Sequence, residues 1–196
     1  HAEDYRIDPD CIFLAGSSAG AITALNAAFM KDDERPESTG GNIWRAQKDL
    51  GGLDESTNYI SGDYRIRAVV NLWGAVSDTL LIDREEDIPV LSIHGSADRI
   101  VPYGHDYPFL DLDTSVTSKI TGKLFGSELI EKRLETLGIH SRLITLNNAG
   151  HEPQFEPGRY ESIMNAIISE TTDFLYRSFF GFPDLTGPRQ IAYGTS

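Results

Sequence analysis

The feature that most constrains the fold is the pentapeptide Gly16-Ser17-Ser18-Ala19-Gly20, which lies between an apolar run (residues 11–15) and a segment with helical spacing of apolar residues (21–30). Strand, tight turn and helix in direct succession form a compact unit, and Gly-x-Ser-x-Gly in that context is typical of an exposed nucleophilic serine. We therefore predict that Ser18 is a nucleophile and that its neighbour Ser17 contacts substrate.

The residue types suit such a turn. A nucleophile between a strand and a helix adopts a strained backbone conformation. Gly16 and Gly20 are expected to let the strand and the helix approach closely, because they have no side chains. The backbone N–H of Ala19 is expected to donate to an oxyanion at the helix N-terminus, where the helix dipole favours negative charge. The pentapeptide alone also fits a turn of small residues without chemistry.

Further strands and helices follow in alternation. Four segments have the apolar, β-branched composition of buried strands: 11–15, 67–73, 89–94 and 141–146. Three have apolar residues at helical spacing: 18–30, 127–137 and 158–180. This alternation predicts an α/β fold with a parallel sheet covered by helices on both faces.

The remaining segments give weaker signals. Residues 78–87 are interpreted as a short helical or loop return, and the Gly-rich residues 31–63 as an excursion with a helix near 43–50, which could form a cap. We predict one domain over residues 1–180 and a tail containing Gly and Pro over 181–196.

Ligands of a parallel sheet bind at the carboxyl ends of its strands. Asp98 follows the third predicted strand and His151 follows the fourth, so the chain order is Ser18, Asp98, His151. This is the order of a nucleophile, an acid and a base in α/β-hydrolases. His151 would take the serine proton and Asp98 would orient the imidazole. Asp78, after the second strand, is an alternative acid.

Aromatic residues and a further histidine follow the same strands. Trp73 and Tyr103 are expected either to line an acyl or aromatic pocket as substrate-binding residues or to fill the core. His94, at the end of the third strand, is expected to be structural and to lie under the loop of the acid.

These motifs resemble those of the α/β-hydrolase-fold serine esterases, in the esterase/lipase and feruloyl-esterase-like branches. The pentapeptide matches the nucleophile elbow, the stretch 94–102 with Asp98 matches the acid loop, and Gly150-His151 matches the histidine loop. The resemblance implies hydrolysis of carboxylic esters through an acyl-enzyme, without a metal or organic cofactor. It implies a small-molecule or polysaccharide-linked ester as substrate. A prolyl-oligopeptidase-type peptidase, a lipase and a non-catalytic hydrolase-like binding module remain alternatives.

The resemblance covers the C-terminal portion of that fold. The family has further strands before the nucleophile strand, whereas a short helical stretch, residues 1–5, precedes it here. The resemblance therefore implies a partial α/β-hydrolase fold that needs an N-terminal half to complete its sheet and its oxyanion hole. The isolated chain is expected to be poorly active. The resemblance to this family implies an extracellular or periplasmic location.

Charge and composition exclude other classes. The 196 residues include 30 acidic and 17 basic ones, for a net charge of −13. A nucleic-acid-binding protein needs a basic face, and the chain has no Lys/Arg run that could form one. No apolar run approaches the length of a membrane span. Cys11 is the one cysteine, so no internal disulfide can form.

Overall fold

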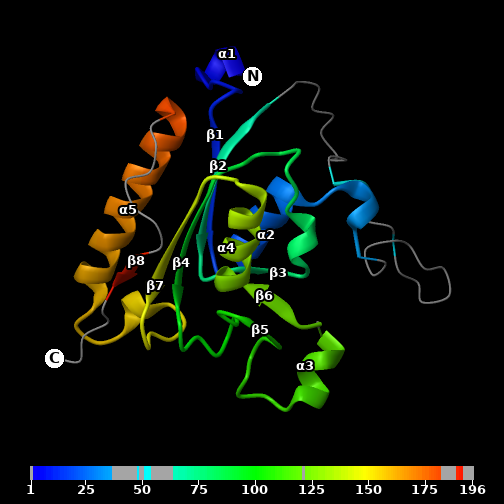
Figure 1. The fold of residues 1–196 in the computed structure, drawn as a ribbon, viewed down its shortest axis with the longest axis vertical. Helices are drawn as coiled ribbons and strands as arrows, with labels where there is room; N and C mark the ends of the chain where they lie inside the picture. Colours follow the sequence, from blue (N-terminus) through cyan, green and yellow to red (C-terminus); the bar gives the residue numbers. More distant parts are fainter. Residues whose placement is uncertain are drawn as a thin grey trace.

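The computed structural model describes residues 2–36, 48, 51–53, 64–120, 122–181 and 189–191. Within these residues the main sheet has the strand order β1-β2-β4-β7-β8, and every neighbouring pair is parallel (Figure 1). The strands are β1 Ile12–Ser17, β2 Ile66–Leu72, β4 Val90–Gly95, β7 Ser141–Leu146 and β8 Arg189–Ile191.

Helices cover both faces of this sheet (Figure 1). The helices α2 Ala19–Phe29 and α4 Ser127–Leu137 lie on one face, and α5 Tyr160–Phe180 lies on the other. Successive side chains of a strand point to opposite faces. Val69 accordingly belongs to the same core cluster as Leu25 of α2, whereas Val70 belongs to that of Ile163 in α5. The predicted α/β fold class is confirmed.

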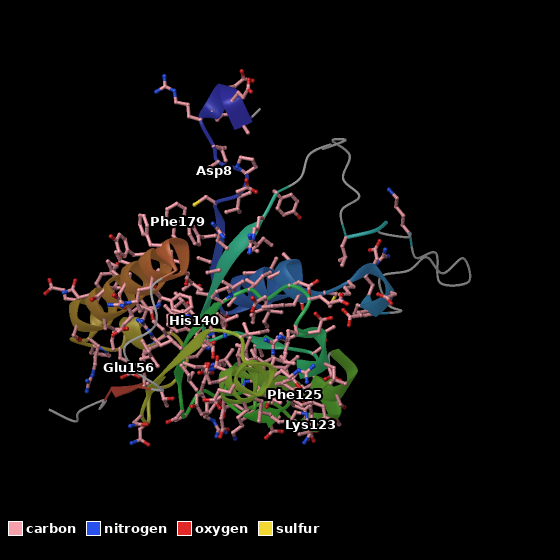
Figure 2. The ribbon with its side chains drawn as sticks, turned by 45° about the horizontal axis from the view of Figure 1, so that its top comes forward. Asp8, Lys123, Phe125, His140, Glu156 and Phe179 are labelled. Atoms are coloured by element: carbon pink, nitrogen blue, oxygen red, sulfur yellow. The ribbon has the colours of Figure 1, made fainter. Side chains whose placement is uncertain are left out.

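Short elements surround the main sheet. They are α1 Ala2–Tyr5, η1 Asp32–Glu34, β3 Ala75–Val76, η4 Thr79–Leu81, β5 His105–Asp106, α3 Thr114–Ile120, β6 Leu124–Gly126 and η5 Pro153–Phe155. Strands β3, β6 and β5 form a second, antiparallel sheet. In Figure 2, Lys123 and Phe125 mark this sheet at one end of the molecule, and Asp8 and Phe179 lie towards the other end. The sequence did not predict these strands, because two or three residues are too short to show a periodicity.

Most predicted boundaries hold to within two residues, and residues 141–146 form β7 as predicted. The first strand, predicted for residues 11–15, continues through Ser17 into the turn. Residues 78–87 contain only the short turn η4. The helix predicted near residues 43–50 and most of the excursion 31–63 lie outside the described residues.

Part of the predicted tail, residues 181–196, belongs to the main sheet. Helix α5 ends at Phe180, and Gly181 caps it with a φ of 70°, a left-handed conformation that glycine adopts without strain. Residues 189–191 then form β8 and pair in parallel with β7. The tail therefore adds an edge strand, which its Gly and Pro content did not indicate.

Strand β1 lies at the opposite edge of the sheet and pairs with β2. Within the described residues no strand pairs with its outer side. Ala15 and Ser17 are exposed there. Among the described strands, β1 is thus an edge strand. In the described part of the chain, no helix has both the length and the apolar character needed to cross a membrane.

Candidate active site

The turn between β1 and α2 holds Ser18 in a strained conformation. Its φ is 54° and its ψ is −124°, a combination that is unfavourable for a residue with a side chain. Its backbone N–H donates to the Leu72 carbonyl at 2.9 Å, which ties the turn to β2. A Cβ atom at Gly16 would lie 2.3 Å from the Gly20 carbonyl, so only glycine fits at position 16.

The same prediction for Gly20 is wrong. Apart from its chain neighbours and the nearby backbone of its own helix, a Cβ atom at Gly20 would have no described atom within 4 Å, and the residue is exposed. The close approach of strand and helix therefore depends on Gly16 alone. The part of Gly20 that lies against Gly16 is its main chain, which a residue of any type would have.

The structure brings the three predicted catalytic residues together. His151 Nδ1 lies 2.7 Å from Asp98 Oδ2, and His151 Nε2 lies 2.9 Å from Ser18 Oγ. An ionised carboxylate can only accept, so Nδ1 carries a proton and donates it to Asp98. Nε2 is then free to accept the hydroxyl proton of Ser18. The arrangement suits proton transfer from the serine to the imidazole.

The carboxylate of Asp98 is buried and fully hydrogen-bonded. Oδ1 accepts from the backbone N–H groups of Ile100 and Val101 at 2.8 and 3.0 Å. Oδ2 lies 2.7 Å from His151 Nδ1 and 3.2 Å from His94 Nε2. Burial raises the pKa of Asp98, but the hydrogen bonds from His151, His94 and Ile100 together hold that pKa well below its usual value. Asp98 is therefore ionised wherever His151 can act as a base.

Asp78, the alternative acid, is engaged elsewhere. It is exposed, and its Oδ1 accepts the backbone N–H of Leu80 at 2.9 Å as the N-cap of η4. Of the two candidate acids, Asp98 is the one bonded to His151.

Ala19 is the first residue of α2. The N–H groups of a helix's first turn have no acceptor within the helix. No described residue accepts a hydrogen bond from the Ala19 N–H. This donor is therefore open, next to Ser18 and at the positive end of the helix dipole.

The predicted substrate-binding residues occupy three different environments. Ser17 is exposed at the end of β1. Trp73 is only 1% exposed, and its ring lies edge-on to His151 at a centroid distance of 6.5 Å. The hydroxyl of Tyr103 is 2.7 Å from Thr145 Oγ1, and its ring lies edge-on to His94. Trp73 thus packs against the candidate base, and Tyr103 packs against His94.

One cluster of carboxylates outside this site has oxygens within 4.8 Å of one another, at Asp83, Glu85 and Glu86. The Lys31 ammonium donates to Asp83 at 2.6 Å and to Glu85 at 2.7 Å. These contacts raise the pKa of Lys31, and the contact with Lys31 lowers the pKa of Asp83 to about 2. The cluster therefore already contains a cation.

A hollow of about 830 Å³ lies at the far end of α2 from Ser18. Its lining comes from the end of α2, the start of β2 and their neighbours, and includes Asn26, Lys31 and Ile66. Ser18, Asp98 and His151 do not line it, so the hollow is separate from the candidate active site.

Comparison with solved structures shows the fold of this chain in esterases. The apo form of Thermogutta terrifontis esterase 2 matches with a TM-score of 0.51 at 17% identity, over 95% of this chain and 62% of that chain. The native structure of Est2, described as a thermophilic esterase from the planctomycete Thermogutta terrifontis, matches with a TM-score of 0.50 at 15% identity, over 95% and 62% of the two chains. A truncated carbohydrate esterase from gut microbiota has a TM-score of 0.48 at 20% identity, over 87% and 63%.

The chain therefore shares the α/β fold of these two Thermogutta terrifontis esterase structures. It spans 62–63% of the length of the structures named above. No protein-family model matches the sequence. No curated protein matches it either.

Proposed function

We propose that this chain is a serine hydrolase of carboxylic esters, with Ser18 as nucleophile, His151 as general base and Asp98 as the acid that orients His151. The observation that carries the proposal is the continuous hydrogen-bonded series from Asp98 Oδ2 through the His151 ring to Ser18 Oγ. Neither a turn of small residues nor a solvated loop histidine requires such an alignment.

In the proposed reaction Ser18 Oγ attacks the ester carbonyl while His151 Nε2 takes its proton. The Ala19 N–H donates to the carbonyl oxygen as negative charge develops on it. His151 then protonates the departing alcohol, which leaves an acyl group on Ser18. A water molecule, deprotonated by His151, attacks this acyl-enzyme and releases the acid. Each covalent and proton-transfer step uses residues of this chain and a water molecule and needs no metal or organic cofactor.

The substrate class is proposed at the same coarse level. Small-molecule esters and acetyl or feruloyl esters attached to polysaccharides are the first candidates. We propose that Ser17 contacts the substrate at the open end of β1 and that Trp73 forms the floor beside His151. A peptidase or a lipase would use the same three residues, and a binding module would use none of them chemically.

A fluorophosphonate probe tests the chemistry directly, because it reacts covalently with an activated serine. We expect wild-type chain to be labelled at Ser18, and Ser18→Ala to lose labelling and to lower ester hydrolysis by roughly 10⁴-fold or more. Ser162→Ala, which removes an exposed hydroxyl on α5, serves as the control and keeps full labelling. A folded wild-type chain that is not labelled would favour the binding module.

A panel of acetyl, feruloyl and long-chain esters, together with a peptide substrate, separates the enzyme classes. An esterase prefers the short or aromatic esters. Preference for long acyl chains would indicate a lipase, and cleavage of the peptide alone would replace the ester proposal by a peptidase.

A second oxyanion donor is proposed to come from a segment that extends the sheet beyond the free edge of β1. The esterase 2 structure is longer than the part that this chain matches, which leaves room for such a segment. A chain extended by it is expected to hydrolyse p-nitrophenyl acetate faster than the 196-residue chain. Equal rates would show that the 196 residues contain every group that the reaction needs.

A further inference from the structure

We propose that His94 is a positioning residue for the reaction proposed above, because it gives Asp98 a second imidazole donor that holds the carboxylate towards His151. The inference rests on the proposed function for its catalytic consequence. Its geometry can be tested without any turnover.

His94 lies near the end of β4 and is completely buried. Its Nε2 is 3.2 Å from Asp98 Oδ2 and also 3.2 Å from the Val101 carbonyl oxygen. Both of these atoms are acceptors, so Nε2 carries the proton. The Oδ2 atom of Asp98 is therefore held between the imidazoles of His94 and His151.

The other side of the His94 ring determines its tautomer. Nδ1 lies 2.8 Å from Ser127 Oγ. Asn71 accepts the Gly74 N–H at its Oδ1, which turns its NH₂ group towards the Ser127 hydroxyl at 3.0 Å. The hydroxyl oxygen thus accepts from Asn71 and its proton is free to point at His94 Nδ1. This network favours the tautomer with its proton on Nε2, whose N–H faces both the Val101 carbonyl oxygen and Asp98 Oδ2.

The network also connects separate parts of the fold to the acid. Asn71 is on β2, His94 is on β4 and Ser127 begins α4. The ring of Tyr103 lies edge-on to His94 at a centroid distance of 5.6 Å and fills the remaining side. Every polar atom of the His94 side chain thus has a partner, and the ring cannot rotate without breaking several hydrogen bonds.

A purely structural histidine would affect stability only. A positioning residue also affects the proton shared by His151 and Asp98, because without His94 the Oδ2 atom has one donor instead of two and a less restricted orientation. Removal of His94 should lower kcat without raising KM, since His94 does not touch the substrate.

The test compares four variants. His94→Leu removes the donor, whereas His94→Gln keeps a side-chain N–H that can reach the position of Nε2. Ser127→Ala removes the hydroxyl that selects the tautomer. His140→Gln is the matched control, because His140, labelled in Figure 2, is also a histidine and is partly buried. Its ring packs edge-on against Phe174 of α5.

The first readouts are the rate of Ser18 labelling by a fluorophosphonate and the kcat and KM of ester hydrolysis. We expect His94→Leu to lower the labelling rate and kcat by roughly 10- to 100-fold with KM changed less than about twofold. We expect His94→Gln to stay within about threefold of wild type and Ser127→Ala to lie between the two. His140→Gln should match wild type.

The second readout is the NMR resonance of the proton on His151 Nδ1, recorded at a pH where the protein is folded. We expect His94→Leu to shift this resonance and the control to leave it unchanged. An unchanged resonance in His94→Leu, or equal rates for His94→Leu and His94→Gln, would overturn the inference. If His94→Leu does not fold, His94→Gln and Ser127→Ala are compared with wild type instead. A kcat and a His151 resonance in Ser127→Ala equal to those of wild type would then overturn the inference.

The two proposals fail differently. A wild-type chain that is neither labelled nor active, both as the 196 residues and when extended beyond β1, overturns the proposed function, whatever the resonances show. A wild-type chain that is labelled but whose His151 resonance ignores residue 94 overturns the role of His94 alone.

Discussion

At the scale of single residues, the turn around Ser18 stores strain that neighbouring contacts must hold. A non-glycine residue with such a backbone conformation is unfavourable by about 1–3 kcal/mol. The hydrogen bond from the Ser18 N–H to Leu72 and the close approach of Gly16 to the start of α2 hold it in place. The two glycines of the motif therefore have different importance.

This difference predicts opposite results for two similar substitutions. Gly16→Ala would place a Cβ atom 2.3 Å from the Gly20 main chain, so we expect a loss of roughly 3 kcal/mol or more in the free energy of unfolding and loss of Ser18 labelling. Gly20→Ala meets open space in a helix and is expected to be neutral or to stabilise by up to about 1 kcal/mol. Urea denaturation of both variants measures the two effects. Similar losses for both would contradict the assignment to Gly16.

At the scale of elements, helix α5 is held on the sheet by more than apolar packing. Arg142 of β7 is 1% exposed and donates to Glu170 and Asp173 of α5, both at 2.9 Å. Its guanidinium also lies over the Phe174 ring, 5.6 Å from the centroid. A buried cation thus meets two carboxylates and an aromatic face of the same helix, which defines how α5 is placed relative to β7.

We expect Arg142→Met to destabilise the chain by about 2–3 kcal/mol, somewhat less than for a fully buried ion pair, because water still reaches the carboxylates. Asp173 is 40% exposed and Glu170 is 16% exposed. Arg177→Met is the matched control, since Arg177 pairs with Asp173 but is 22% exposed, and it should destabilise by about 1 kcal/mol or less. Urea denaturation measures both, and equal effects would show that burial of Arg142 is not the cause.

At the scale of the whole molecule, the chain combines an excess of acidic residues with a few carboxylates that the fold stabilises in their charged form. Besides Asp98, the pKa of Asp173 is lowered: burial opposes this shift, but hydrogen bonds from Arg142 and Arg177 prevail. The pKa of Asp83 is lowered to about 2 by its contact with Lys31. Glu86 differs, because burial raises its pKa.

These directions predict how stability depends on pH. A carboxyl group with a lowered pKa in the folded state stabilises the fold above its unfolded pKa of about 4, and this contribution is lost as the pH falls towards the folded value. We expect the buried Asp98 to outweigh Glu86 and the relief of charge repulsion, so the urea midpoint should fall between pH 4 and pH 2. Asp98→Asn should show a shallower dependence. If the urea midpoints of wild type and Asp98→Asn fell equally with decreasing pH, Asp98 would not be the cause of the pH dependence.

The strongly patterned segments could be predicted from the sequence, and the short or context-dependent features could not. Residues 127–137 form the predicted helix because their apolar residues recur at helical spacing, and residues 141–146 form the predicted strand because they are a short run of mostly apolar and β-branched residues. The second sheet and β8 were missed, because strands of two or three residues form only where another strand is already in place. The free space for a side chain at Gly20 could not be predicted either, because the spacing of residues in a motif does not show which atoms come into contact.

The sequence by itself determined the order and identity of Ser18, Asp98 and His151 and the strand after which each one comes, because each follows a segment with a strong local pattern. Only the tertiary structure decided that a second histidine, His94, shares the carboxylate of Asp98, and that Asn71 and Ser127 orient its ring. These contacts join residues up to 56 positions apart, as between Asn71 and Ser127. They depend on strand alternation, sheet register and the start of α4, which local sequence does not encode.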